Sequence, residues 1–189
     1  MSGSARVDDD DGAAAGLAAT VERLAARLRA VEDVQAIERL KASYGELVDR
    51  RYGPHGIVAA AELDALATAI ADLFTPDAVW DGGKVLGLCR GRAAIRERFR
   101  EPTLSFSWHF FVKPRIEVVG DRASGTWDIL APCTTRDGRA QWMAGVEEDE
   151  YERVDDRWLH RSMKLRVVFL APYELGWARK PAPPPGAKP

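Results

Sequence analysis

The stretch SFSWHFFVKPRIEVVGDRASGTWDILA, residues 105–131, decides the fold class of this chain. Polar and apolar residues alternate through much of it, and the pair Gly120-Asp121 separates two alternating runs. This is the pattern of antiparallel strands joined by a tight turn. The strands predicted from such runs are 78–81, 84–89, 105–112, 115–119, 122–131, 140–153 and 157–170. The later part of the chain is therefore predicted to form a largely antiparallel sheet.

The residues before this stretch follow a helical period instead. Apolar residues recur at spacings of three and four from Leu17 to Val48. This spacing predicts either one long helix or two helices joined near Asp33, with Gly53-Pro54 as the stop. Two more helices are predicted at 59–73 and 92–100. Helices followed by a run of strands favour an α+β domain, in which the helices pack on one side of a strongly bent sheet.

The composition limits the size of the domain and its partners. The 189 residues, 46% of them hydrophobic, suffice for one domain with a core. An acidic segment at 1–16 and a Pro-rich segment at 179–189 are predicted to be disordered tails. A formal net charge of −2 argues against a nucleic-acid partner. No apolar run approaches the roughly 20 residues of a membrane span.

The N-terminus and the cysteines suggest where the protein is found. The first residues lack the basic-then-apolar order of a secretory signal. Two cysteines, Cys89 and Cys133, are too few for a metal-binding motif and fit a reduced compartment. We therefore expect a cytoplasmic protein.

The first half of the long helix, residues 17–32, is predicted to be a helical arm. Its apolar residues alternate between spacings of four and three, as in a coiled coil. We expect a homo-oligomer, a trimer or a dimer, in which this arm and the segment 169–177 pack between subunits.

His109 is the residue of the central stretch best suited to chemistry. An imidazole titrates near neutral pH, so a histidine inside a cavity can take or release a proton. Alternation places His109 with Ser105, Ser107 and Phe111 on one partly polar face of the predicted strand. On the residues alone a structural or surface role is favoured, because most histidines are not catalytic.

An imidazole base works best with a carboxylate that fixes its tautomer, and Asp49 near the end of the long helix is a candidate. A helical wheel places Asp49 about 140° from Tyr44, the centre of the apolar stripe, which favours a solvated acid. Tyr44 is either a core aromatic or a hydrogen-bond donor to a substrate oxygen. The residues alone leave the pairing of Asp49 with His109 open.

Several short motifs follow one another in a recognisable order. They are AIERL at 36–40, Tyr44, Asp49, FTPDAVW at 74–80, GRAAI at 91–95, His109, PRIEV at 114–118, GTW at 125–127, DEYER at 149–153 and Trp158. Their order and spacing resemble the SnoaL-like branch of the nuclear transport factor 2-like (NTF2-like) superfamily over about residues 33–170. We therefore assign 33–178 to a SnoaL-like domain.

The resemblance implies a fold and a reaction type. Similar members include scytalone dehydratase, bile acid dehydratase and the dehydrochlorinase of hexachlorocyclohexane. It implies a cone-shaped α+β fold, the NTF2-like or cystatin-like roll, with helices over the concave side of a curved sheet. It also implies a lyase without cofactor or metal, in which Asp49 and His109 form a proton-transferring dyad. Tyr44 matches a position that helps to hold the substrate or leaving group.

Two positions depart from those relatives. Ala131 stands where bile acid dehydratases carry an acid. Met163 stands where these enzymes and the dehydrochlorinase carry an arginine. Both departures favour the alternative that the chain is a non-catalytic ligand-binding or structural NTF2-like subunit. An Asp49 carboxylate that faces solvent and lies more than about 4 Å from either ring nitrogen of His109 would support that alternative.

The first hypothesis is a cofactor-independent lyase of dehydratase type, or a related isomerase or cyclase, that acts on a small hydrophobic cyclic molecule. His109 would remove a proton, Asp49 would orient the imidazole, and Tyr44 would donate a hydrogen bond to the developing oxyanion. The residues predicted to bind substrate are Trp80, Phe111, Trp127, Trp142 and Met163. The sequence names neither the substrate nor the choice between elimination and isomerisation.

Overall fold

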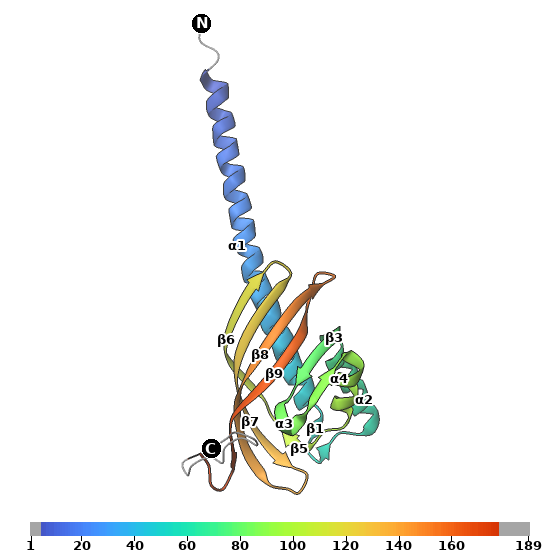
Figure 1. The fold of residues 1–189 in the computed structure, drawn as a ribbon. Coiled ribbons are helices and arrows are strands. Elements are labelled where there is room, and N and C mark those ends of the chain that lie inside the picture. The colour runs from blue at the N-terminus through green and yellow to red at the C-terminus, as the bar shows by residue number, and fades with distance from the viewer. Residues whose placement is uncertain (1–4, 178–189) are drawn as a thin grey trace.

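The computed structural model describes residues 5–177 (Figure 1). Its elements are α1 Ala5–Asp49, β1 Tyr52–Gly53, β2 Gly56–Ile57, α2 Ala60–Ala71, β3 Phe74–Asp81, α3 Gly83–Leu86, β4 Leu88–Arg90, α4 Arg92–Arg100, β5 Leu104–Ser107, β6 Phe110–Val119, β7 Arg122–Thr135, β8 Ala140–Val154 and β9 Arg157–Pro172. The long strands follow the helices in the chain, as the sequence predicts.

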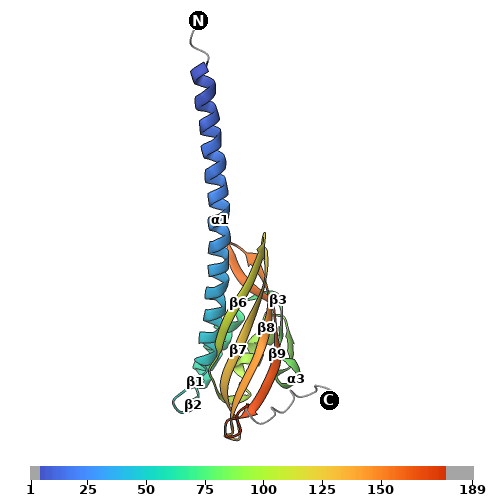
Figure 2. The ribbon, with the colours of Figure 1, turned by 90° about the vertical axis from the view of Figure 1, so that its left-hand side faces the viewer.

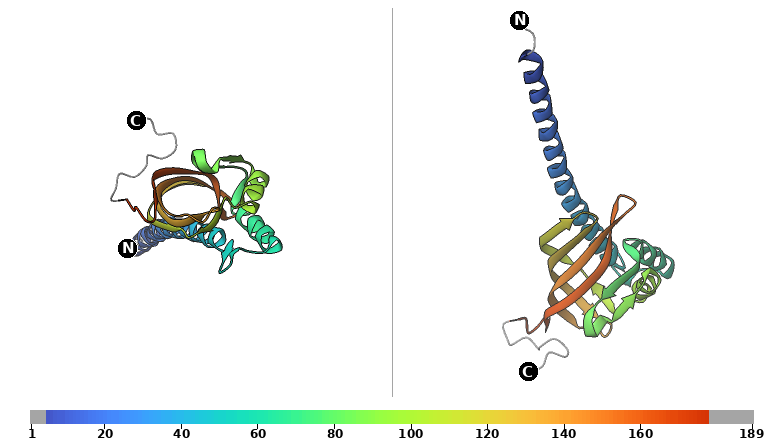
Figure 3. Two further views of the ribbon diagram at one scale, coloured as in Figure 1. Left: turned by 90° about the horizontal axis from the view of Figure 1, so that it is seen from below. Right: turned by 45° about the horizontal axis from the view of Figure 1, so that its top comes forward.

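The main sheet has seven strands in the order β4-β3-β9-β8-β7-β5, and β6 also pairs with β7. The pair β3 and β9 is parallel, and the other pairings are antiparallel. Strands β7 to β9 are 14 to 16 residues long. Seen from below they curve around like the wall of a cone (Figure 3). The predicted strongly curved, mostly antiparallel sheet is therefore confirmed.

The helices pack against the concave side of this sheet. The second half of α1 runs alongside β6 (Figure 2), and α2 and α4 lie against each other beside β3. The main core cluster combines side chains from α1, α2, β3, α4 and β9. Its buried members are Tyr44, Val48, Ala67, Ile70, Phe74, Ala78, Trp80, Ile95, Phe99 and Met163. The apolar stripe of α1 thus contributes Tyr44 and Val48 to the core between the helices and the sheet.

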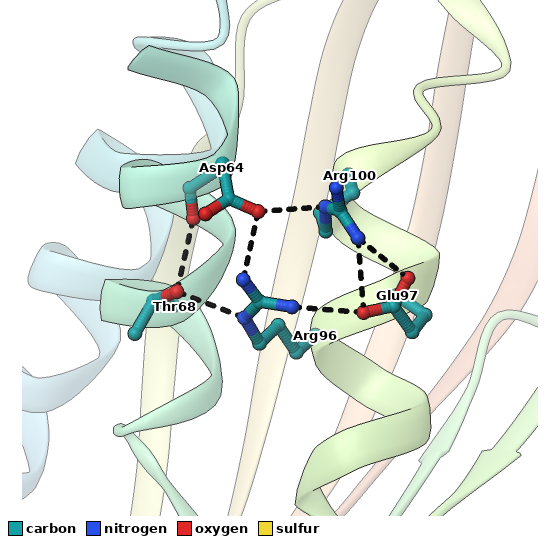
Figure 4. A network of polar contacts seen from close by, with 5 residues as sticks. All are labelled: Asp64, Thr68, Arg96, Glu97 and Arg100. Atoms are coloured by element: carbon teal, nitrogen blue, oxygen red, sulfur yellow. Dashed lines mark hydrogen bonds and ion pairs between the residues drawn. The ribbon is translucent and has the colours of Figure 1, made fainter. Parts of the chain in front are cut away.

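A network of ion pairs fixes α2 against α4 (Figure 4). Asp64 on α2 forms ion pairs with Arg96 and Arg100 on α4, each with a nitrogen–oxygen distance of 2.7 Å. Arg96 also donates to the hydroxyl of Thr68 at 2.9 Å, and both arginines contact Glu97. Each pair is partly exposed and contributes at most about 1 kcal/mol. Together they set the position of α4, whose other face lies against the core.

Helix α1 differs from the prediction at its start. It is a single helix, and it begins at Ala5, inside the segment 1–16 that was predicted to be disordered. An established helix extends at little cost through alanine-rich sequence, which explains why residues 5–16 are helical. Residues 1–4 and the predicted tail 179–189 lie outside the described residues. The first half of α1 projects well beyond the sheet (Figures 1 and 2).

Two predicted strands are wrong in part. The first half of 84–89 forms the helical turn α3, bounded by Gly83 and Gly87 with φ of 69° and 86°. The predicted strand 105–112 is divided into β5 and β6. At the division Trp108 donates its N–H to the carbonyl oxygen of Pro132 at 3.1 Å. Pro132 has no N–H to return that bond, so the ladder is interrupted there.

In the part of the chain that the structure describes, no helix combines the length and apolar character that crossing a membrane requires.

Candidate active site

His109 lies in the interruption between β5 and β6, beside the end of α1. Its backbone N–H donates to Oδ2 of Asp49 at 2.9 Å, and its ring Nδ1 lies 2.5 Å from Oδ1 of the same carboxylate. One carboxylate therefore holds both the backbone and the ring of His109. The outward N–H groups of an edge strand have no partner strand, and Asp49 accepts a hydrogen bond from one of them.

Asp49 reaches His109 because α1 and β6 approach each other closely. Gly45, one turn before Asp49 on the same side of α1, faces Phe111, and a Cβ at Gly45 would lie 3.1 Å from that ring. Strand β6 therefore covers the flank of α1 that carries Gly45 and Asp49, and Asp49 is only 8% exposed. The wheel-based interpretation of Asp49 as a solvated acid is wrong for this reason.

The contact with Asp49 determines which ring nitrogen of His109 is available. An ionised carboxylate accepts hydrogen bonds only, so Nδ1 carries a proton in this arrangement, by inference from the bonding pattern. In the neutral imidazole Nε2 then holds a lone pair, and it bonds to no described residue. The ring lies parallel to that of Phe111, with centroids 5.9 Å apart and planes 11° apart. Nε2 is thus an oriented proton acceptor.

His109 is one of the residues that line a cavity of about 150 Å³ inside the cone. The other side chains of the wall come from α1, β3, α4 and the long strands and are mostly apolar. The polar ones include Tyr44, Arg51, Arg98, Ser107, Gln141 and Glu147. An apolar cavity of about this volume accommodates a benzene ring. The enclosed part of the site therefore suits a single six-membered ring.

Tyr44 presents a fixed hydroxyl group at this wall. Trp80 donates its indole N–H to the Tyr44 oxygen at 3.1 Å. Burial raises the pKa of Tyr44 well above its ordinary value, and the negative charge of Glu147 adds to this effect. The hydroxyl therefore keeps its proton, and no described residue accepts that proton in a hydrogen bond. Tyr44 is available as a donor to a ligand.

A buried cluster of charges that the sequence analysis missed lies beside the cavity. Lys41 on α1 forms ion pairs with Glu147 and, at 2.7 Å, with Asp149, both on β8. Tyr151 donates to Asp149 at 2.8 Å, and Trp127 donates to the Tyr151 oxygen at 2.9 Å. The pKa of Lys41 stays above its ordinary value, because the attraction of Asp149 and Glu147 outweighs burial. Glu147 belongs both to this cluster and to the cavity wall.

Two sequence signals could have identified this cluster. Lys41 lies within the apolar stripe of α1, one turn before Tyr44, where a lysine is unexpected. Glu147, Asp149 and Tyr151 alternate along one strand, so they share one face. A lysine in an apolar stripe and two acids on one strand face together predict a buried ion-pair cluster.

His160 is a buried neutral histidine next to this cluster. Its side chain is fully enclosed, and neither ring nitrogen has a hydrogen-bond partner among the described residues. Burial, and then the charge of Lys41, hold its pKa well below the ordinary value. Its Nδ1 lies 3.9 Å from Asp149, too far for a hydrogen bond, and because the ring is neutral the contact is not an ion pair.

Comparison with known proteins identifies the family. Residues 29–164 match the SnoaL-like domain. The chain belongs to the SnoaL-like family. No curated protein matches the sequence of this SnoaL-like chain.

Solved structures show the same fold. A protein assigned as an aromatic ring hydroxylase from Novosphingobium aromaticivorans is 26% identical, with a TM-score of 0.61, over 75% of this chain and 94% of that one. A hexachlorocyclohexane dehydrochlorinase from Novosphingobium barchaimii is 21% identical, with a TM-score of 0.63, over 84% and 99% of the two chains. A protein assigned as a scytalone dehydratase from Novosphingobium aromaticivorans is 19% identical, with a TM-score of 0.63, over 84% and 97%. The SnoaL-like chain has the NTF2-like, cystatin-like α+β fold.

The residues predicted to bind substrate in this SnoaL-like domain divide into three groups. Trp80 lines the cavity. Phe111, Trp127 and Met163 lie behind its wall: Phe111 against Tyr44 and His109, and the other two in the core. Trp142 is on the outer face, where its ring contacts Trp177 with centroids 6.1 Å apart. The prediction for Trp142 is wrong, because Gln141 and Met143 on either side of it face the cavity.

The two positions at which this SnoaL-like chain departs from its relatives are both buried. Ala131 is opposite His109 across the interrupted ladder and leaves room in the cavity wall. Met163 pairs with Trp80 between β9 and β3 and packs into the core. Among the described residues no group of three His, Cys, Asp or Glu side chains is placed to hold a metal ion.

Proposed function

We propose that this SnoaL-like protein is a cofactor-independent lyase of dehydratase type that acts on a small hydrophobic cyclic molecule. The observation that carries the proposal is the contact between Asp49 and His109 at the wall of a cavity of one-ring size. Family membership and the neighbours named as a dehydratase and a dehydrochlorinase support an enzyme of the lyase or isomerase class.

The reaction begins with proton removal by His109. Nε2 takes a proton from a ring carbon next to a carbonyl group, and Asp49 stabilises the imidazolium that forms. The electron pair of the broken C–H bond first forms the enolate. It then forms the carbon–carbon double bond as the bond from the neighbouring carbon to its hydroxyl group breaks. The imidazolium returns its proton to the departing hydroxide, so water leaves and His109 is neutral again.

Tyr44 stabilises the negative charge that develops on the carbonyl oxygen. Its hydroxyl is held by Trp80 and stays protonated because it is buried. Donors fixed before the reaction stabilise a developing oxyanion without reorganisation, and in an enclosed site one such donor contributes on the order of 3 kcal/mol. The same residues serve an isomerase or cyclase, because these reactions also start from proton abstraction next to a carbonyl.

The distance between Asp49 and His109 favours the enzyme over a non-catalytic subunit. A separation above about 4 Å would support the non-catalytic alternative, whereas Nδ1 and Oδ1 are 2.5 Å apart. The carboxylate also bonds to the backbone of the histidine, so the ring is oriented before any ligand binds.

The test is turnover of a panel of six-membered cyclic β-hydroxy ketones, monitored by the absorbance of the conjugated product. We expect His109→Ala to abolish turnover and Asp49→Asn to lower it by about 10⁴-fold, because an amide misorients the imidazole. Both variants should unfold at nearly the wild-type temperature and bind a ketone product with nearly wild-type affinity. Glu46→Gln, an exposed acid one turn before Arg50 on α1, is the matched control and should retain full turnover. Wild-type turnover in His109→Ala would disprove the mechanism.

We also propose that the protein is a homo-oligomer in which the arm of α1, residues 17–32, packs against a second copy. The apolar residues of the arm, from Leu17 to Val31, are each more than half exposed. They lie beyond the sheet, where no described residue of the same chain covers them (Figure 1).

A further inference from the structure

Arg51 is a buried cation at the cavity wall without a carboxylate partner. It is 6% exposed and lies just after the end of α1. Its Nε donates to the carbonyl oxygen of Val48 at 3.0 Å. Its terminal nitrogens lie 3.4 Å from the carbonyl oxygen of Phe99 and 3.5 Å from the hydroxyl of Tyr52. It forms no salt bridge with any residue that the structure describes. These contacts leave part of its five-donor fork unused.

A buried guanidinium without a counter-charge is costly, so its presence at a cavity needs a reason. Asp49 attracts Arg51 only weakly. Both oxygens of that carboxylate bond to His109, so neither forms a direct contact with the guanidinium. Burial lowers the pKa of Arg51, and the charge of nearby Arg98 lowers it further. The fold therefore places positive charge where the protein itself supplies little to neutralise it.

Arg98 adds a second positive charge to the same wall. It extends from α4 and donates to the carbonyl oxygens of Leu86 and Glu101 at 3.1 and 2.9 Å. Like Arg51, it forms no salt bridge within the described part of the chain. Both side chains line the one-ring cavity. Two arginine side chains thus line one cavity.

Ser107 independently indicates a ligand at this place. Its hydroxyl oxygen is buried, lines the cavity and has no hydrogen-bond partner among the described residues. Its strand β5 lies against the β1 strand that follows Arg51, and the rings of Tyr52 and Phe106 are in contact there. An unpaired buried hydroxyl is uncommon, and a ligand oxygen would satisfy it.

The opposite end of the site carries negative charge. Glu147 reaches the cavity wall from the cluster in which one ammonium, Lys41, faces two carboxylates, so that one negative charge is left in excess. Lys41 and Asp49 are eight residues apart on α1, which corresponds to about 12 Å along the helix axis. The acidic cluster and Arg51 are therefore separated along α1, so the cavity has a positive end and a negative end. An anionic group is attracted to Arg51 and repelled by Glu147.

We propose that Arg51, with Arg98 and Ser107, binds a carboxylate group of a ligand whose apolar ring fills the rest of the cavity. The planar fork of a guanidinium matches the two oxygens of a carboxylate. The substrate class is then a cyclic carboxylic acid, held at one end by Arg51 and presented to His109. The inference rests on the proposed function only in naming this ligand as the substrate.

The test compares benzoate with benzamide, which have the same ring and nearly the same shape but differ in charge. Binding to the full chain at pH 7 is measured by NMR titration, which reports millimolar affinities. We expect the wild-type protein to bind benzoate at least tenfold more tightly than benzamide. Arg51→Gln should weaken benzoate binding by about 10- to 100-fold and leave benzamide binding unchanged. Equal affinities for the two compounds in the wild-type protein would overturn the proposal.

The controls separate ligand binding by Arg51 from a structural role, because its guanidinium also donates hydrogen bonds to the carbonyl oxygens of Val48 and Phe99. Arg50→Gln removes an exposed arginine next to it and should leave both affinities unchanged. Arg51→Lys keeps the charge and should retain most of the preference for benzoate. A loss of benzamide binding together with benzoate binding in Arg51→Gln would assign Arg51 a structural role and overturn the proposal. If Arg51→Gln does not fold, the wild-type comparison and Arg51→Lys decide the question.

The same measurements distinguish this inference from the proposed function. His109→Ala should bind benzoate with wild-type affinity, since His109 is not part of the carboxylate site. Benzoate preference that depends on Arg51, together with turnover that does not need His109, would refute only the proposed mechanism. Turnover that needs His109, together with no preference for benzoate, would refute only the carboxylate site.

Discussion

Asp149 illustrates how a single buried residue makes stability depend on pH. Burial, together with the neighbouring charge of Glu147, raises its pKa from 3.8 to about 6 despite the attraction of Lys41. The folded protein therefore holds this proton more tightly than the unfolded chain. The resulting stabilisation is fully present below pH 3.8 and is lost as the pH rises through about 6.

We therefore predict that the difference in unfolding free energy between wild type and Asp149→Asn changes with pH. Relative to the variant, the wild-type protein should lose stability between about pH 4 and pH 7, as measured by urea unfolding. His160, with its lowered pKa, favours folding above pH 6.5 and loses this effect as the pH falls, but it does so in both proteins. Glu148→Gln, an exposed acid next to Asp149, should leave the pH dependence unchanged. A difference that is constant over this range would contradict the raised pKa.

The candidate site could be predicted from sequence only through the resemblance to a family. The helical wheel placed Asp49 in solvent, because a wheel describes one helix and not the strand that covers its other side. The pairing with His109 depends on Gly45, which lets β6 approach α1. Arg51 directly follows Arg50, and two adjacent arginines do not show which of them is buried. Nothing local in the sequence says which of these side chains faces the cavity.

Among the elements, strands β8 and β9 pair through a bulge near Gly145. Ala144 pairs with Phe169 and Gly145 with Val167, so Val168 is an extra residue on β9. A bulge of this kind increases the local twist of a strand pair. Gly145 is required there because a Cβ would lie 2.8 Å from the carbonyl oxygen of Arg166.

We predict that Gly145→Ala lowers the free energy of unfolding by about 1–3 kcal/mol, because backbone must move to admit the methyl group. Urea unfolding measures this change. Gly53→Ala is the matched control: its new Cβ would meet its nearest neighbour at 3.9 Å, an ordinary contact. If Gly145→Ala changes the free energy of unfolding no more than Gly53→Ala does, the backbone at the bulge accommodates a methyl group and glycine is not required there.

Elements with a clear period were predictable, and those set by distant residues were not. The strands from 122 onward and α4 follow from alternation and from helical spacing within their own residues. The break at Trp108 depends on Pro132, which follows it by more than twenty residues and removes a donor from the partner strand. The α3 turn depends on glycines at positive φ, and alternation at 84–89 does not reveal it.

For the whole molecule, the arm of α1 is the feature that the cone does not explain. In its heptad pattern Val21 and Leu28 are the a positions, and Leu17, Leu24 and Val31 are the d positions. A β-branched residue at a with leucine at d, as for Val21 between Leu17 and Leu24, favours a two-stranded coiled coil. In a parallel pair Arg27 of one copy lies next to Glu32 of the other, and neither has an ion-pair partner among the described residues of its own chain. An antiparallel pair does not bring these charges together, so we expect parallel arms.

We therefore predict that the full chain is a dimer at micromolar concentration by multi-angle light scattering, and that Leu24→Asp converts it to a monomer. The aspartate places a charge in the core of the pair, where it loses its hydration. Ala26→Asp adds the same charge two residues away, on the outer side of the helix, and should leave the dimer intact. Exchanging the charges in the double variant Arg27→Glu and Glu32→Arg should also preserve the dimer, whereas either change alone should weaken it by bringing like charges together. A wild-type protein that is monomeric would refute the proposed homo-oligomer. If the Leu24→Asp variant is still a dimer, the interface is formed by the exposed segment 169–177 and not by the arm.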